Sequence, residues 1–114
     1  MKVYGILNCN TVKAARAWLD ANRQRYEFVD FKKTPPTKDL LVRWCAAFGW
    51  QNVLNRRGTT WRMLPPAEQE KVTNESRAIA LMLTKPSLIK RPVIEEGKQL
   101  LIGFDEGDYL KKLR

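Results

Sequence analysis

Polar and apolar positions in the early part of the chain alternate between extended and helical patterns. Residues 2–7 form an apolar run that favours a β-strand, and a polar turn follows. Apolar residues then recur at three- and four-residue steps, which predicts a helix from about Thr11 to Asn22 with Asn10 or Thr11 as its N-cap. Residues 25–31 alternate again, as a second strand does. A strand, a helix and another strand predict a parallel pair of strands.

The pattern in the middle of the chain predicts mainly helices, with short helical segments around a basic turn. The segment Thr37-Lys38-Asp39 is expected to cap one long helix and Gly49 to end it. A further helix, capped by Thr73 or Asn74, is expected to end before Pro86.

The last part of the chain reads as a β-hairpin and a short helix. Residues 88–94 and 99–103 are the expected hairpin strands, and residues 105–114 the closing helix. With the opening strands, this order predicts an α/β fold, a mixed four-stranded sheet of thioredoxin type with flanking helices. We expect a single domain over residues 1–114 with a helical insertion at about 35–85.

The composition indicates the cellular compartment in which the protein is expected. The chain has 114 residues, enough to bury a core of its own, and every apolar stretch is far shorter than the roughly 20 residues of a membrane span. The two cysteines lie far apart, and the opening residues do not resemble a secretory signal. We therefore expect a soluble protein of the reducing cytoplasm with no membrane partner.

Charge and residue types limit the chemistry. The formal net charge of +9, with a pI near 9.9, suits nucleic acid, acidic membrane surfaces or small anionic substrates. The basic residues are scattered and follow no nucleic-acid-binding signature, so a dedicated nucleic-acid role is not expected. The sequence has no histidine, which excludes a histidine-based triad and an ordinary zinc site.

Cys9 stands where the first predicted strand passes into the first predicted helix, at the sheet edge where ligands of open α/β sheets collect. Helix starts carry unpaired N–H groups and partial positive charge, which stabilise the reactive thiolate. From this position alone, a buried and inert thiol is an equally open interpretation. Lys13, four residues on, either helps to hold the thiolate or is simply solvated. Cys45 lies in an apolar helical stripe and is expected to be buried and structural.

Two basic segments elsewhere are candidates for the functional site. Arg56 and Arg57 precede Gly58, a combination found in solvated loops and also in anion clamps, where the glycine lets backbone N–H groups approach. Arg91 precedes Pro92 at the start of a predicted strand. That bond is either an ordinary strand entry or a cis peptide that fixes a sharp turn at a functional edge.

Three ordered motifs carry a resemblance to a known family. They are Tyr4-Gly5-Ile6-x-Asn8-Cys9-x-Thr11-Val12-Lys13-x-Ala15-Arg16, Asn55-Arg56-Arg57-Gly58-Thr59-Thr60-Trp61 and Lys85-Pro86-x-Leu88-Ile89-Lys90-Arg91-Pro92. Over essentially its whole length the chain resembles the arsenate reductase/Spx family, in particular its small YffB branch. The resemblance implies a thioredoxin-like core with an inserted helical region, a nucleophilic Cys9, and Arg91 before a cis-proline.

The resemblance also implies which residues hold the substrate. Arg56, or alternatively its neighbour Arg57, matches one anion-holding arginine of the family, and Arg91 matches another. The remaining candidates for substrate binding are neighbours of Cys9 or of Arg91 in the sequence: Asn8, Asn10, Thr11, Lys13 and Pro92.

The chain departs from the family pattern in two places. Gly103 stands where arsenate reductases carry a third arginine, so the clamp for a tetrahedral oxyanion is incomplete. Cys9 is followed by Asn10-Thr11-Val12 where Spx-type regulators commonly have a CxxC pair, so a disulfide switch within the chain is not expected. A single thiol needs an external thiol to complete a redox cycle. Glutathione, which is anionic, is the expected co-substrate.

These observations lead to one main hypothesis and one alternative. The main hypothesis is a cytoplasmic thiol oxidoreductase in which Cys9 attacks a sulfur or oxyanion substrate, Arg56 and Arg91 hold negative charge, and glutathione regenerates the thiol. No tightly bound cofactor and no metal are expected. The alternative is an Spx-like adaptor that uses its basic face to bind a protein partner without turnover.

Overall fold

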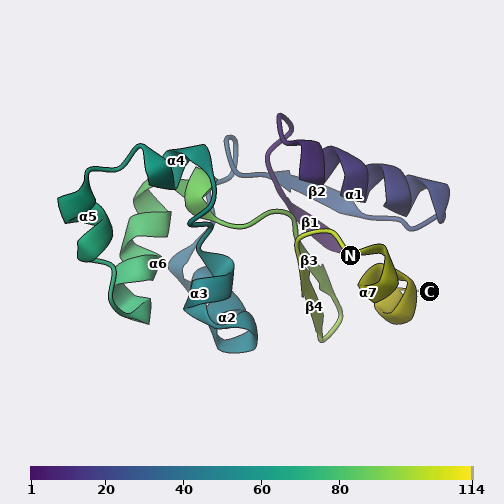
Figure 1. The fold of residues 1–114 in the computed structure, drawn as a ribbon. Coiled ribbons are helices and arrows are strands. Elements are labelled where there is room, and N and C mark those ends of the chain that lie inside the picture. Colours follow the sequence, from purple (N-terminus) through teal and green to yellow (C-terminus); the bar gives the residue numbers. More distant parts are fainter. Residues whose placement is uncertain (114) are drawn as a thin grey trace. The chain divides into compact units, whose positions relative to one another are not determined.

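The computed structural model describes residues 1–113, and these form two compact units (Figure 1). One unit comprises Met1–Thr34 together with the chain from Arg91 onward, and the other comprises Pro35–Lys90. Among the described residues no helix is both long and apolar enough to span a bilayer.

The first unit is a four-stranded mixed sheet with two helices. Its strands are β1 (Lys2–Gly5), β2 (Glu27–Asp30), β3 (Val93–Glu96) and β4 (Gln99–Ile102), and its helices are α1 (Asn10–Ala21) and α7 (Glu106–Leu113). The strand order is β2-β1-β3-β4, with β1 and β2 parallel and the other two pairs antiparallel. The predicted thioredoxin-type sheet, with its parallel pair and its hairpin, is therefore confirmed.

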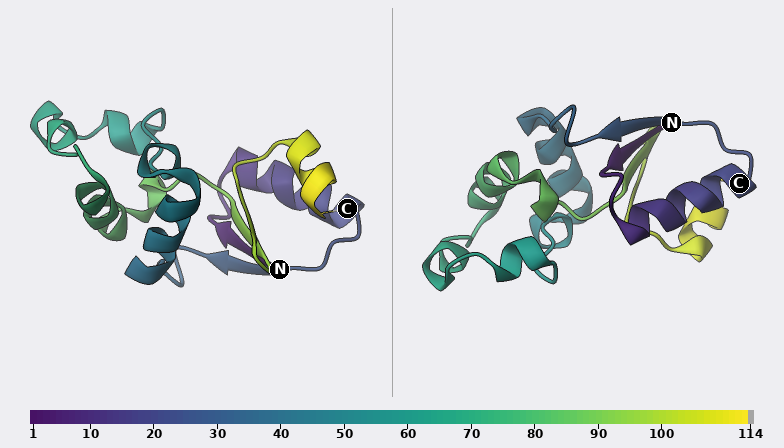
Figure 2. Two further views of the ribbon diagram at one scale, coloured as in Figure 1. Left: turned by 90° about the horizontal axis from the view of Figure 1, so that it is seen from below. Right: turned by 90° about the horizontal axis from the view of Figure 1, so that it is seen from above.

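Both helices of this unit cover one face of the sheet, as Figure 2 shows. Six buried side chains from the strands and the helices meet there: Val3, Ala15, Leu19, Ile94, Leu101 and Tyr109. The Tyr109 ring makes edge-to-face contacts with Trp18 and Phe104, at centroid distances of 5.4 and 5.0 Å. Burial of this apolar face is what holds α1 and α7 against the strands.

The second strand is shorter than the alternating pattern predicts. The pattern covers residues 25–31, whereas β2 begins at Glu27, which pairs with Lys2 at the start of β1. Residues before Glu27 lie beyond the paired part of β1 and have no strand to bond with. Alternation indicates which residues can enter a strand, but pairing decides where the strand begins.

The second unit is helical. It contains α2 (Lys38–Phe48), α3 (Trp50–Val53), α4 (Thr59–Arg62), α5 (Pro66–Glu70), α6 (Glu75–Thr84) and the 3₁₀ turn η1 (Pro86–Leu88). The predicted caps are confirmed, because the Thr37 side chain accepts from the Leu40 N–H at 3.2 Å and the Asn74 side chain accepts from the Arg77 N–H at 2.9 Å. Gly49, with φ of 85°, ends α2 as expected.

The prediction of a hairpin strand over residues 88–94 is wrong in its first half. Leu88 belongs to η1, and Ile89 forms an isolated antiparallel bridge with Leu54 inside the helical unit. The Asn55 N–H donates to the Leu88 carbonyl at 2.7 Å, and the Lys90 N–H donates to the Val53 carbonyl at 2.8 Å. The apolar character of this stretch serves the core of the helical unit, and β3 starts only at Val93, after Pro92.

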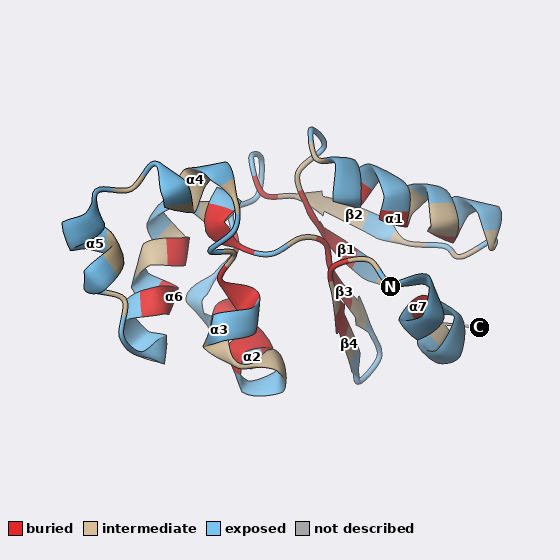
Figure 3. Cartoon of the chain, in the orientation of Figure 1, coloured by how far each residue is buried: buried red, intermediate tan, exposed pale blue. Residues whose placement is uncertain are grey.

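Cys45 is one of the buried residues of α2, as predicted, and the buried positions of this helix are red in Figure 3. Burial, with a smaller contribution from the nearby charge of Glu75, raises the pKa of the Cys45 thiol to about 11. The thiol therefore stays protonated at neutral pH and serves as a small apolar residue.

Candidate active site at the start of the first helix

Cys9 is itself the residue that begins α1. We predicted Asn10 or Thr11 as the N-cap, but the helix starts at Asn10, and Cys9 is the cap, with an extended backbone of φ −149° and ψ 122°. The Cys9 carbonyl accepts the first helical hydrogen bond, from the Lys13 N–H at 2.9 Å. Cysteine is not a preferred capping residue, which is why capping propensity favoured its polar neighbours.

The first turn of α1 lies very close to the end of β1. A Cβ atom added at Gly5 would lie 3.0 Å from a methyl group of Val12, so the glycine permits this close approach. Val12 is fully buried and fixes the turn against the strand. The segment that carries Cys9 is therefore held between two anchored positions, while Cys9 itself remains partly exposed.

The pKa of the Cys9 thiol lies below its ordinary value. Partial burial is the largest single influence and opposes ionisation, but the remaining influences together outweigh it. These are the backbone N–H of Val12, the hydrogen-bonding and the charge of the Arg91 guanidinium, and the backbone N–H of Thr11. Helix-start N–H groups and a neighbouring cation are the two features that activate cysteines.

Arg91 reaches Cys9 from the other end of the sequence. It stands just before β3, and its bond to Pro92 is cis, as the resemblance implied. Pro92 is buried, and its carbonyl accepts from the Gly103 N–H at 2.8 Å, at the end of β4. The sheet thus brings Arg91 to the thiol through β3, which pairs directly with β1.

Four of the predicted binding residues surround the thiol along the chain. Asn8, Asn10, Thr11 and Lys13 are all exposed, so the chain on both sides of Cys9 presents polar side chains to solvent. Lys13 contributes its backbone N–H to the helix, and its side chain is exposed.

Leu7 is a neighbour of the site that the sequence pattern did not single out. We placed it in the first strand, but β1 ends at Gly5, and Leu7 is 50% exposed two residues before Cys9. The signal that could have revealed it is the position of Gly5, which ends the strand early.

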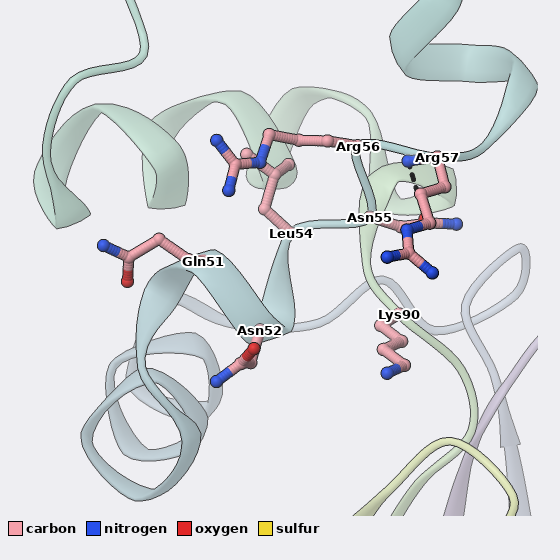
Figure 4. Close-up of a pocket in the computed structure, with 7 residues that line it drawn as sticks. All are labelled: Gln51, Asn52, Leu54, Asn55, Arg56, Arg57 and Lys90. Carbon is pink, nitrogen blue, oxygen red and sulfur yellow. Dashed lines mark hydrogen bonds between the residues drawn. The ribbon is translucent and has the colours of Figure 1, made fainter.

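Arg56 and Arg57 belong to the helical unit. Both are exposed, and both line a pocket of about 430 Å³ within that unit (Figure 4). The Arg56 guanidinium lies 5.8 Å from the centre of the Trp50 ring. Within residues 1–113 no group of three or more metal-ligating side chains is found.

Comparison with known proteins places the chain in a family. The ArsC family model matches residues 4–112. The solved structure of the YFFB (PA3664) protein is 47% identical, covers 99% of this chain and 98% of its own, and superposes with a TM-score of 0.95. The solution structure of an arsenate reductase (ArsC) related protein from Brucella melitensis is 40% identical, with coverage of 99% and 93% and a TM-score of 0.75.

A regulator is also among the relatives. The global transcriptional regulator Spx of Streptococcus mutans is 26% identical over 103 residues, which are 89% of this chain and 74% of the regulator. Reductase-like and regulatory proteins therefore share this fold and sequence pattern. The matches confirm the family that the three motifs indicated, and the chain belongs to the ArsC family.

Proposed function

We propose that this protein is a thiol oxidoreductase in which the Cys9 thiolate is the nucleophile and glutathione is the reducing co-substrate. The observation that carries the proposal is the lowered pKa of Cys9, produced by helix N–H groups and by Arg91. A lowered pKa increases the share of thiolate, which is the form of cysteine that attacks sulfur, and Cys9 is partly exposed.

The proposed reaction has two thiol–disulfide exchanges. The Cys9 thiolate attacks the glutathione sulfur of a mixed disulfide, a new S–S bond forms on Cys9, the old S–S bond breaks, and the released thiolate takes a proton from water. The thiolate of a second glutathione then attacks the glutathione sulfur held on Cys9. This step releases the Cys9 thiolate and oxidised glutathione, so the substrate thiol is reduced at the expense of glutathione.

Arg91 has two roles in this reaction. Its charge holds the attacking sulfur as a thiolate, and the same charge attracts the carboxylates of glutathione. After the first exchange the sulfur is no longer charged, and Arg91 is available to the bound glutathione. The lowered pKa also makes Cys9 a good leaving group in the second exchange.

A disulfide suits this site better than a tetrahedral oxyanion. Gly103, which replaces the third family arginine, lies beside Pro92 and has no side chain to offer a second charge. One guanidinium balances one thiolate but leaves a multiply charged oxyanion without a full set of partners. We therefore propose disulfide exchange as the reaction.

Turnover with reduced glutathione and a small glutathione mixed disulfide tests the proposal. The wild type and Cys45→Ala are expected to turn over equally, because Cys45 is buried away from solvent. Cys9→Ser is expected to lose turnover, and mass spectrometry is expected to find glutathione attached to Cys9 in the wild type. Turnover that persists in Cys9→Ser would refute the proposed nucleophile.

The second candidate is an adaptor without turnover, which the similarity to Spx favours. Here the same fold binds a protein partner, and Cys9 has no essential part. Binding of a specific purified partner that is equally tight for the wild type and Cys9→Ser, in a protein without glutathione-coupled turnover, would favour the adaptor over the enzyme.

A further inference from the structure

The segment that carries Arg91 is anchored at Pro92. Proline has no N–H, so the carbonyl is the one hydrogen-bonding group of the Pro92 backbone. That carbonyl accepts from the Gly103 N–H at 2.8 Å. Pro92 and Gly103 are both buried, so water does not readily replace this bond. The placement of Arg91 at the start of β3 therefore depends on where Gly103 lies.

Gly103 is in turn held by a side chain. With φ of 74°, it follows the last residue of β4 and turns the chain toward α7. Its carbonyl oxygen accepts a hydrogen bond of 2.6 Å from the hydroxyl group of Tyr109, which belongs to α7. Gly103 thus uses both of its backbone groups, the N–H for Pro92 and the carbonyl for Tyr109. Two hydrogen bonds lead from the Tyr109 hydroxyl to the residue next to Arg91.

Tyr109 also contacts the helix that begins at Cys9. Helices α1 and α7 lie on the same face of the sheet (Figure 2), and the Tyr109 ring meets Trp18 of α1 edge-to-face at a centroid distance of 5.4 Å. The Tyr109 side chain is only 1% exposed, so its position is closely defined by packing. One side chain therefore touches the helix of the thiol and, through Gly103, supports the segment of the guanidinium.

The Tyr109 hydroxyl remains a hydrogen-bond donor over the range of pH in which a cysteine ionises. Burial raises the pKa of this hydroxyl well above its ordinary value. The hydroxyl therefore carries no charge when the Cys9 thiol titrates. Any influence that it has on the ionisation of Cys9 must act through the positions of other groups.

We propose that Tyr109 is a positioning residue for the thiol chemistry of Cys9, because its hydroxyl keeps the Arg91 guanidinium beside the sulfur through Gly103 and Pro92. This inference rests on the proposed function, in which Cys9 is the nucleophile. For opposite charges about 4 Å apart at an effective dielectric constant of about 20, moving them about 0.5 Å further apart raises the pKa of the thiol by roughly 0.3. A small displacement of Arg91 is therefore measurable at Cys9.

The pH midpoint of Cys9 alkylation, in a Cys45→Ala background, tests the proposal. Tyr109→Phe keeps the ring and removes the hydroxyl, and is expected to raise the midpoint by roughly 0.3 pH unit or more. In an Arg91→Gln background the same substitution is expected to change the midpoint by less than about 0.1 pH unit, because the charge that Tyr109 positions is gone.

Ile94→Val is the control for a general loss of stability. Ile94 is buried in the same core cluster as Tyr109, and removing one of its methylene groups costs stability of the same order as losing a buried hydrogen bond. The Ile94 side chain has no part in the hydrogen bonds that link Tyr109 to Pro92. The midpoint of Cys9 in this variant is therefore expected to stay within about 0.1 pH unit of the wild type.

Amide hydrogen exchange provides a second measurement, which follows the anchor itself. The Gly103 N–H is expected to exchange at least about tenfold faster in Tyr109→Phe than in Ile94→Val, because its bond to Pro92 opens locally in the first variant. Global unfolding speeds the exchange of core amides in both variants. The comparison thus separates release of Gly103 from a loss of overall stability.

Four results would overturn the proposal. They are an unchanged midpoint in Tyr109→Phe, an equal rise in Ile94→Val, a rise that persists in the Arg91→Gln background, and equal exchange of the Gly103 amide in both variants. Each would mean that the hydroxyl contributes stability alone or acts on Cys9 without Arg91. Alkylation requires no turnover, so a failed glutathione assay would refute the proposed function without changing these shifts.

Discussion

The hydroxyl group of Tyr109 donates a 2.6 Å hydrogen bond to the carbonyl oxygen of Gly103. The N–H of Gly103 in turn donates to the Pro92 carbonyl at 2.8 Å, so α7 is tied through the end of β4 to the residue that follows Arg91. Tyr109 is only 1% exposed, which means that water does not compete for this bond. The backbone at Gly103 thus supports the segment that carries Arg91.

Loss of the Tyr109 hydroxyl is expected to destabilise the first unit. Tyr109→Phe leaves the Gly103 carbonyl without this donor in a buried setting, which costs about 1–3 kcal/mol. Urea unfolding followed by circular dichroism measures the loss. Tyr26→Phe is the control, since its half-buried hydroxyl accepts from Arg16 near solvent and is expected to matter less. An unchanged free energy of unfolding in Tyr109→Phe would contradict the role given to this bond.

Restoring a side chain at position 103 is expected to be unfavourable. Gly103 has φ of 74°, a conformation that costs other residues about 1 kcal/mol, so both Gly103→Ala and Gly103→Arg should lower the free energy of unfolding. Gly97→Ala isolates the backbone cost, because φ there is 58° and no other heavy atom lies within 4 Å of an added Cβ. If Gly103→Ala is as stable as the wild type, the backbone does not disfavour an arginine here.

The two cysteines are expected to differ sharply in reactivity. In the folded protein at neutral pH, iodoacetamide should modify Cys9 quickly and Cys45 only after unfolding, because Cys45 is 3% exposed and its pKa is raised to about 11. Peptide mass spectrometry after timed quenching distinguishes the two sites. Equal rates at both cysteines in the native protein would contradict this assignment.

The raised pKa of Cys45 also predicts a pH dependence of stability. The pKa of the thiol is about 8.5 in the unfolded chain and about 11 in the folded protein. Its contribution to stability is therefore fully present below pH ~8.5 and is lost as the pH rises through that window. Relative to Cys45→Ala, the wild type should lose stability between about pH 8.5 and 11, as denaturant midpoints would show. A difference between the two proteins that is independent of pH would argue against the raised pKa.

Most of the fold was predictable because the local sequence patterns agree with the way the strands pair. The strand–helix–strand opening, the Thr37 and Asn74 caps and the Gly49 stop all rest on residues whose chemistry acts within a few positions. The prediction failed at residues 88–94, where the apolar run indicates burial without indicating which unit buries it. Leu88 and Ile89 enter the core of the helical unit, a long-range choice that no local pattern reveals.

The site was predictable in part for the same reason. Cys9 at a strand-to-helix junction is a local signal, and its placement at a helix start follows from it. The approach of Arg91 depends on the pairing of β3 with β1, and only the family resemblance indicated it beforehand. The cap itself was mispredicted because capping preferences favour polar side chains, whereas this position keeps a thiol.

The most direct measurement is the rate of Cys9 alkylation against pH, in a Cys45→Ala background. We expect a midpoint clearly below the ~8.5 of an ordinary thiol, raised toward that value in Arg91→Gln and less in Arg91→Lys, which keeps a cation. Lys13→Gln removes an exposed charge four residues from the thiol and is expected to move the midpoint less than Arg91→Gln does. A wild-type midpoint at or above ~8.5, or one that Arg91→Gln leaves unchanged, would contradict the claim that Arg91 and the helix start hold Cys9 as a thiolate.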